Sequence, residues 1–284
     1  GMITDAETNF VYFSELLRQK PRYMAFHQKL SQLLDRLGIA YDYLPETRDI
    51  WCRDYMPVQV SLDSFVGFSY DPDYLKEERW QHLRTYSGLV YEPMEMKTEK
   101  SAIILDGGNV IRWKDKVILT DKIVSENAHQ LTKSQLIRGL EEVFRVDQII
   151  LIPRYPEDIF GHADGMLRFI DGQTLLIDGF LKSKESGIGD QLLSVLKEHH
   201  LEAIPLDFNV PVQSRHNWGY LNFLQMENLL LLPQFGIAED QQALQQISAL
   251  FPEAARKDQV HTIDAQELIR DGGALNCISW NIRV

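Results

Sequence analysis

Residues 272–277 read GGALNC, and short polar motifs of a similar kind stand at nearly equal steps before them. The earlier motifs are WCRDYMP from Trp51, DGGN from Asp106, GHAD from Gly161 and NWGYLN from Asn217. With Gly272, their first residues are 55, 55, 56 and 55 positions apart. A fixed period of this length indicates a repeat architecture. We therefore predict one closed domain over residues 1–284, in which five units of about 55 residues surround an axis and bring all five motifs to the same end.

The stretches between the motifs carry a strand-like run, an amphipathic helix and a second strand-like run. In the first unit, Phe10–Phe13 is predicted as a strand and Ile39–Leu44 as its partner. Gly38 suits the C-terminus of the helix between them. The apolar face of that helix is formed by Phe26, Leu30, Leu33, Leu34 and Leu37.

The later units are predicted to open near Phe65, Val117, Leu175 and Leu229. Apolar residues at helical spacing predict helices through Leu136–Val143, Leu192–Leu196 and Leu244–Leu250. A helix is also predicted around Leu75–Leu83, where the pattern is weakest.

Composition narrows the class of protein. The 284 residues are 44% hydrophobic and 25% charged, as in globular proteins. A net charge of -12 argues against nucleic acid as a partner. No run suits a membrane span or a signal peptide, so we expect a cytoplasmic location and no membrane partner. Gly1 before Met2 is typical of an expression scar. Homo-oligomerisation stays open.

The two cysteines are too few for a disulfide framework in a chain of this length. Cys277 follows the Gly272-Gly273 turn, and glycine lets the backbone approach a ligand closely. A thiolate near an imidazolium would have a depressed pKa and would be a competent nucleophile. Cys52, between Trp51 and Arg53, is interpreted as a packing residue.

The acidic residues of the motifs indicate a cationic ligand. His162 and Asp164 are two residues apart, so they project from one face of an extended segment. With Asp54 and Asp106 they would gather several negative charges, which is costly unless the site binds a metal, shares a proton or meets a cation. A planar guanidinium matches carboxylates bidentately, and Trp51 could pack on it.

Other interpretations stay open at this point. The motifs could be repeated turns in which Gly and Asp serve the backbone. His162 and Asp164, with Asp54, Asp106 and His216, could supply nitrogen and oxygen ligands to a metal. Trp51 could equally be a core aromatic.

The motif order WxRDxxP, xGGN, GHxD, YxN…PQFG and GGxxxC resembles the agmatine deiminase and bacterial (Porphyromonas-type) peptidylarginine deiminase family. The matching segments are Trp51–Pro57, Asp106–Asn109, Gly161–Phe169, Gly219–Gly236 and Gly272–Cys277. The resemblance implies membership of the guanidino-group-modifying (pentein) superfamily, whose fold is a five-bladed α/β propeller. It also implies a hydrolase that acts on C–N bonds of linear amidines without cofactor or metal.

Position by position, the resemblance implies that Cys277 is the nucleophile and His162 the general acid/base. Asp54 and Asp164 match the carboxylates that hold the guanidinium, and Asn222 matches a residue that lines the site. Asp106, before GGN, stands where relatives carry acidic residues. We count Asp106, Asn222 and Trp51 with the two carboxylates as expected substrate-binding residues.

The implied reaction converts a small cationic guanidino compound to a ureido product and ammonia through a covalent amidino-thioether. Agmatine is the first candidate substrate, which would place the protein in putrescine and polyamine metabolism. Arginine or peptidyl-arginine as substrate and amidino transfer to an amine are alternatives within the superfamily. Two further alternatives are a metal-dependent hydrolase using His162, Asp164 and Asp106, and a guanidine-binding protein without activity.

Two features bear on the substrate. Asn276 departs from the family pattern, because relatives usually carry His immediately before the nucleophile. In the peptidylarginine branch, the region matching Tyr70–Asp73 carries basic residues that bind a substrate carboxylate. Asp71 and Asp73 are predicted here to favour an ammonium tail instead, unless the segment is only a solvated turn.

Overall fold

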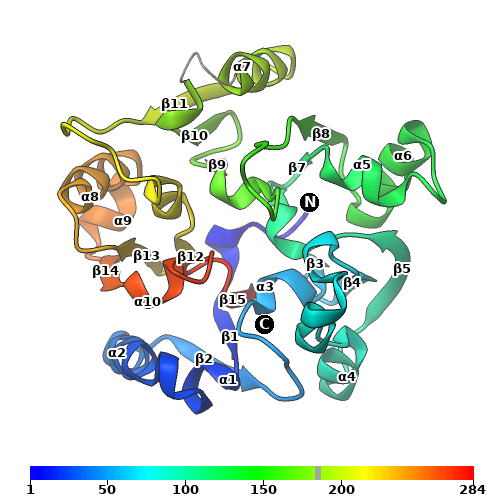
Figure 1. Cartoon of the computed structure of the whole chain (residues 1–284), viewed down its shortest axis with the longest axis horizontal. Coiled ribbons are helices and arrows are strands. Elements are labelled where there is room, and N and C mark those ends of the chain that lie inside the picture. Colours follow the sequence, from blue (N-terminus) through cyan, green and yellow to red (C-terminus); the bar gives the residue numbers. More distant parts are fainter. Residues whose placement is uncertain (183–186) are drawn as a thin grey trace.

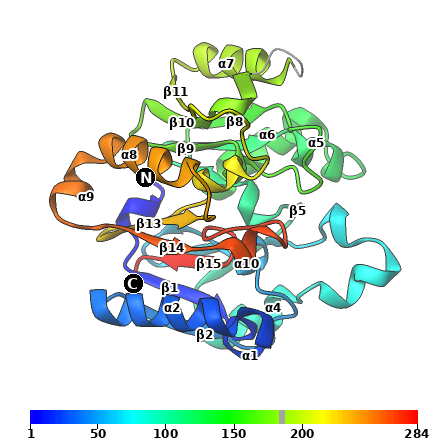
Figure 2. The same cartoon turned by 60° about the vertical axis from the view of Figure 1, so that its left-hand side comes forward.

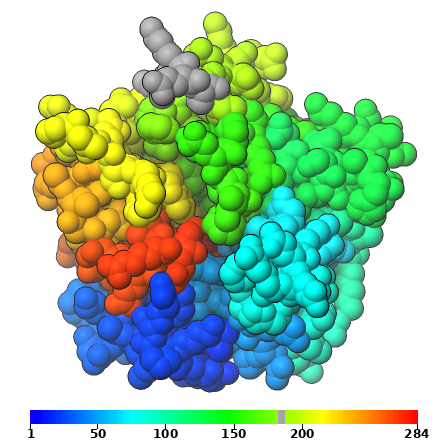
Figure 3. Space-filling view, in the orientation of Figure 1, coloured from blue at the N-terminus to red at the C-terminus, as the bar shows by residue number. Residues whose placement is uncertain are grey.

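Five three-stranded sheets surround a central axis in the computed structural model, which describes residues 1–182 and 187–284 (Figure 1). In every sheet the inner strand pairs antiparallel with the middle strand, which pairs parallel with the outer one. The helices lie mainly on the outer side, and the space-filling view has a five-sided outline (Figure 3). The predicted five-bladed α/β propeller is confirmed.

Each blade consists of one sheet and the helices that connect its middle and outer strands. From the inner strand outward, the sheets are β15 (Ser279–Ile282), β1 (Phe10–Ser14), β2 (Ala40–Leu44); β3 (Val58–Ser61), β4 (Ser64–Ser69), β5 (Thr98–Ile104); β6 (Ile111–Arg112), β7 (Lys116–Thr120), β8 (Gln148–Ile152); β9 (Leu167–Phe169), β10 (Thr174–Asp178), β11 (Glu202–Leu206); and β12 (Leu224–Met226), β13 (Leu229–Gln234), β14 (Val260–Asp264).

The helices of the described residues are α1 (Leu16–Gln19), α2 (Pro21–Leu37), α3 (Cys52–Tyr55), α4 (Ser87–Tyr91), α5 (Lys122–Asn127), α6 (Lys133–Phe144), α7 (Ile188–Glu198), α8 (Glu239–Leu250), α9 (Pro252–Arg256) and α10 (Gln266–Ile269). None is long and apolar enough to cross a membrane. Figure 2 shows the same ring in an oblique view.

Helix α2 shows why these segments fold as they do. Pro21 begins the helix, where its missing N–H costs nothing. Phe26, Leu30 and Leu34 bury one face of it, as predicted. Gly38 ends it in the left-handed conformation at a φ of 68°, which glycine adopts without a steric penalty. The helices predicted in the third, fourth and fifth units are likewise confirmed as α6, α7 and α8.

The second blade differs from its prediction. The prediction of an amphipathic α-helix around Leu75–Leu83 is wrong, because the chain there forms two 3-10 turns at Asp73–Leu75 and Glu78–Leu83. All side chains from 76 to 82 are exposed, so this stretch has no apolar face to bury against the sheet.

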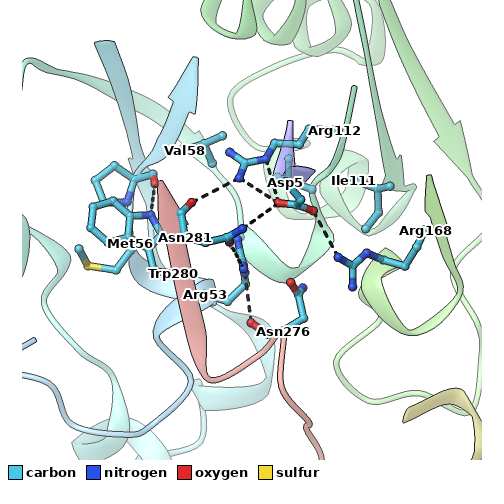
Figure 4. A pocket seen from close by; sticks show the side chains of 13 residues that line it. Asp5, Arg53, Met56, Val58, Ile111, Arg112, Arg168, Asn276, Trp280 and Asn281 are labelled. Atoms are coloured by element: carbon cyan, nitrogen blue, oxygen red, sulfur yellow. Dashed lines mark hydrogen bonds and ion pairs between the residues drawn. The ribbon is translucent and has the colours of Figure 1, made fainter. Parts of the chain in front are cut away.

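Near the axis, the N-terminal segment inserts a carboxylate between the inner strands (Figure 4). Asp5 pairs with Arg112 of β6 at 2.9 Å and with Arg168 of β9 at 3.3 Å. Burial by itself would raise the pKa of Asp5, but the charges of Arg112, Arg168 and Arg53 outweigh it and hold the pKa well below its ordinary value. This network ties the third and fourth blades together at the centre of the ring.

Candidate active site

The five motifs converge at the axis because each connects the outer strand of one blade to the inner strand of the next. A cavity of about 50 Å³ lies among them. Of the predicted site residues, Trp51, Asp54, His162, Asp164 and Cys277 line it. The other lining residues are Tyr74, Asp158, Phe160, Gly165, Trp218, Asp271, Gly272 and Gly273.

Cys277 is held at the cavity wall by its backbone and lies next to a carboxylate. Its N–H donates to Asn222 Oδ1 at 3.1 Å, and its Sγ lies 3.6 Å from Asp164 Oδ2. Burial, followed by the charges of Asp164 and Asp54, raises the thiol pKa well above its ordinary value. The depressed pKa expected from the sequence is therefore wrong for the site without a ligand, where burial and the two carboxylates raise it.

His162 lies between two carboxylates. Its Nε2 is 2.8 Å from Asp106 Oδ2, and its Nδ1 is 3.7 Å from Asp54 Oδ1. Burial alone would lower the imidazole pKa, but the charge of Asp54 and the hydrogen bond to Asp106 outweigh it and raise the pKa to about 9. The imidazole is therefore protonated at neutral pH and can donate a proton to a bound ligand.

Asp54 is fixed by two donors. The Gly108 N–H donates to Oδ1 at 3.0 Å, and the Tyr74 hydroxyl donates to Oδ2 at 2.9 Å. Burial is the main reason that the pKa of Asp54 rises to about 6, and the charge of His162 opposes that rise. A Cβ on Gly108 would lie 2.7 Å from Asp54 Oδ1 and 2.8 Å from His162 Nδ1, so the second glycine of GGN is required here.

Asp164 faces both Cys277 and the residue before it. Asn276 Nδ2 donates to Asp164 Oδ2 at 2.9 Å, so the family departure supplies a hydrogen bond to the carboxylate that lies beside the thiol. The same Asn276 accepts from Arg53 Nε through its carbonyl at 3.2 Å. Asn276 therefore separates the cavity from the arginine-rich network around Asp5.

Two residues expected to bind substrate do not line the cavity. Asp106 is buried behind His162, and its Oδ2 also accepts from Lys122 Nζ at 2.7 Å. Asn222 is fully buried and accepts from the Cys277 backbone instead. In this structure Asp106 contacts the imidazole and Asn222 contacts the backbone of Cys277, and binding of substrate by either residue stays a prediction.

Lys122, at the start of α5, is a residue that sequence reasoning missed. It is 2% exposed, and besides Asp106 its ammonium donates to Asp73 Oδ1 at 3.0 Å and to the Phe160 carbonyl at 2.8 Å. It thereby connects the loops that carry Asp73 and Phe160 to the partner of His162. No motif signals this lysine, because its acceptors come from three different segments.

The predicted tail-binding role of Asp71 and Asp73 is wrong. Neither lines the cavity. Asp71 pairs with Arg84 at 3.2 Å, and Asp73 pairs with Lys122 at 3.0 Å and Arg154 at 3.4 Å. Their charges are already matched by cations of the protein.

The remaining expectations concern Trp51, Cys52 and the metal interpretation. Trp51 lines the cavity and also packs against the Gly272-Gly273 turn, where a Cβ on Gly273 would lie 2.3 Å from its ring. Cys52 is fully buried, with Sγ 3.1 Å from the Ile278 carbonyl, which fits a packing residue. Residues 1–182 and 187–284 contain no group of three or more His, Cys, Asp or Glu arranged to hold a metal, and His216 lies outside the cavity lining.

Comparison with known proteins supplies the family. The model of Porphyromonas-type peptidyl-arginine deiminases matches residues 2–282. The chain belongs to this family. It is therefore an enzyme of a deiminase family that acts on guanidino C–N bonds.

Individual relatives of this deiminase are distant. A Mycoplasma mycoides protein provisionally named agmatine deiminase is 22% identical over 279 residues, covering 81% of this chain and 74% of its own. The agmatine deiminase of C. jejuni is 18% identical, with a TM-score of 0.77 over 99% of this chain and 95% of its own. A cysteine-to-serine variant of that enzyme with substrate bound aligns at 18% identity with a TM-score of 0.75, also over 99% and 95%. At these identities the structural match shows a shared fold.

Proposed function

We propose that this protein hydrolyses a small cationic guanidino compound, with Cys277 as the nucleophile and His162 as the acid and base. The observation that carries the proposal is that the Cys277 thiol, the His162 imidazole and the carboxylates of Asp54 and Asp164 line one cavity. A bound cation stabilises buried carboxylates that lie close together.

The two carboxylates would hold the guanidinium by bidentate hydrogen bonds, leaving its central carbon next to Sγ. The same cation would neutralise the charges that now raise the thiol pKa, namely those of Asp164 and Asp54. Binding of the substrate therefore favours loss of the thiol proton to solvent. The Cys277 thiolate therefore forms when the guanidinium is bound.

In the first half-reaction, the thiolate adds to the guanidinium carbon and forms a C–S bond. The protonated His162 gives its proton to the departing nitrogen, the C–N bond breaks, and ammonia leaves an amidino-thioether on Cys277. A pKa of about 9 keeps the imidazole in the required acid form.

In the second half-reaction, the now neutral His162 accepts a proton from water as the water oxygen attacks the same carbon. The C–S bond breaks, the thiolate of Cys277 is released, the second proton of the attacking water passes through solvent to the ammonia, and a ureido product leaves. Overall, one water and one guanidinium give one ureido group and one ammonium ion.

Agmatine is the favoured small substrate. The cavity carries Asp158 in addition to the two guanidinium-binding carboxylates, which suits a substrate without a carboxylate of its own. Agmatine is also the substrate named for the C. jejuni relative, which this chain matches in fold. The test is to incubate the protein with agmatine, arginine and a peptidyl-arginine, and to measure ureido product and ammonia. Absence of both products from all three substrates would overturn the proposal. Transfer of the amidino group to an added amine would favour a transferase.

A further inference from the structure

A second cavity opens beside the one at Cys277. Its volume is about 430 Å³, against about 50 Å³ for the first. The two share Asp158, Phe160, Gly165, Trp218 and Gly272 in their linings. The two cavities therefore adjoin, and the tail of a ligand whose guanidinium lies at Cys277 needs to pass only these shared residues to reach the larger cavity.

The larger cavity exceeds what the tail of agmatine can fill. A single water needs a cavity of about 15 Å³, so 430 Å³ is room for many more heavy atoms than the four methylenes and one ammonium of that tail. Apolar walls that face an unfilled space lose their dispersion contacts. The cavity is thus matched to a bulkier substituent.

The walls and the mouth of this cavity are largely apolar. Met166 and Leu181 are buried in its lining. At the mouth, Ile159 is 68% exposed and Phe180 is 52% exposed, and the ring of Tyr155 meets that of Phe180 edge-on at 6.5 Å. Large apolar side chains gathered around an open cavity are typical of a ligand-binding site.

The charged groups of the lining disfavour a ligand that carries a carboxylate. Among the described residues of the lining, Glu157, Asp158 and Asp178 are countered only by Arg215. A ligand carboxylate would meet a net negative wall. Asn217, also in the lining, is buried and neither its Oδ1 nor its Nδ2 has a hydrogen-bond partner among the described residues. A buried amide without a partner is costly, and a small shift of its side chain would let it bond an amide group of a ligand in the cavity.

We propose that the larger cavity binds the far end of the substrate, and that the substrate class is the acylated guanidinoalkylamines. Such a compound has a guanidino group, a short alkyl chain, and an amide that carries an apolar or aromatic acyl group, with no carboxylate. The inference rests on the proposed deimination at Cys277 and names the tail of its substrate. The acyl group is the part that Tyr155 and Phe180 cover.

The experiment compares kcat/KM for agmatine, N-benzoylagmatine and Nα-benzoylarginine. Burying the phenyl ring should give N-benzoylagmatine a kcat/KM about ten-fold or more above that of agmatine. Nα-benzoylarginine, which adds a carboxylate to the same scaffold, should fall below N-benzoylagmatine. A kcat/KM for N-benzoylagmatine that only equals or falls below that of agmatine would overturn the inference.

The variant Phe180→Ala tests the cavity itself, with Leu62→Ala as its matched control. Both side chains are more than half exposed, and Leu62 lines neither cavity. The preference for N-benzoylagmatine over agmatine should fall about ten-fold in Phe180→Ala and stay unchanged in Leu62→Ala. An unchanged preference in both would contradict the inference.

Binding measurements on an inactive variant test this inference separately from the proposed chemistry. The Cys277→Ser variant cannot turn over, so calorimetry gives its Kd for both ligands directly. Tighter binding of N-benzoylagmatine supports the tail assignment even if the wild-type protein hydrolyses neither compound, a result that would defeat only the proposed function. Equal or weaker binding of N-benzoylagmatine would overturn the tail assignment while leaving the hydrolysis of agmatine untouched.

Discussion

Asn276 donates its side-chain amide to the Oδ2 atom of Asp164, the same oxygen that lies 3.6 Å from the Cys277 thiol. The residue before the nucleophile thus controls the orientation of the carboxylate beside it.

Replacement of Asn276 tests that contact. Asn276→Ala should lower kcat/KM by about ten-fold or more, because a hydrogen bond to a charged group contributes about 1.5–3 kcal/mol. Asn276→His restores a donor and should recover part of the loss. Steady-state kinetics on both variants provide the measurement. Equal activity of the alanine variant and the wild type would show that Asp164 needs no such support.

The nucleophile assignment predicts opposite behaviour of the two cysteines. Cys277→Ser should abolish turnover with the fold intact, whereas Cys52→Ser should retain most activity, because Cys52 is fully buried away from the cavity. Ureido assays and circular dichroism on the two variants give the comparison. An inactive Cys52 variant beside an active Cys277 variant would reverse the assignment.

The Asp164→Asn substitution should raise the rate at which the Cys277 thiol is alkylated and lower the rate of deimination. Without the carboxylate, the thiol pKa of Cys277 falls, since the charge of Asp164 is, after burial, the next largest cause of its elevation. Iodoacetamide should therefore alkylate the free variant faster than the wild type at pH 8. Deimination should slow, because a lost charge-assisted contact to the substrate costs about 2–4 kcal/mol. Alkylation rates from mass spectrometry check the first effect, and slower alkylation of the variant would contradict the electrostatic account.

Replacement of Asp106 should shift the pH dependence of kcat/KM. Its hydrogen bond helps to raise the pKa of His162 to about 9, so Asp106→Asn should move that pKa down toward the ordinary value of 6.5. Because protonated His162 is the proposed acid, the alkaline limb of kcat/KM moves to lower pH. NMR titration of the imidazole in wild type and variant gives the shift directly. An unmoved titration would leave Asp106 with a packing role.

Chelation separates the proposed chemistry from a metal-dependent hydrolase. Turnover by Cys277 and His162 needs no divalent ion, so activity should survive dialysis against EDTA. The readout is ureido production before dialysis, after it, and after adding zinc or manganese. Activity that is lost on dialysis and returns with one of these ions would favour the metal interpretation.

The five-fold period predicted the architecture well because every motif occupies an equivalent place, after an outer strand and before the next inner one. That equivalence also brought Asp54, His162, Asp164 and Cys277 to one cavity, although Asp54 and Cys277 are 223 positions apart in the sequence. Periodicity failed in the second blade, where residues 76–82 have no apolar face.

The contacts behind the cavity could not be predicted from the sequence. Lys122, Asp73 and Phe160 meet through side-chain and carbonyl geometry across three loops, and no spacing rule encodes such a meeting. The same holds for Asp106, whose carboxylate turned out to lie behind His162. Sequence position can place a residue at the axis, but the direction of its side chain depends on its neighbours.

Strand β15 pairs with β1 and so joins the last described strand to the first. Cys277 lies two residues before that strand, at the point where the ring closes. During synthesis, the ribosome therefore completes all of the acidic residues of the cavity before the thiol can take its place. The proposed site is therefore incomplete until β15 has paired with β1, so closure of the ring and completion of the site depend on the same contact.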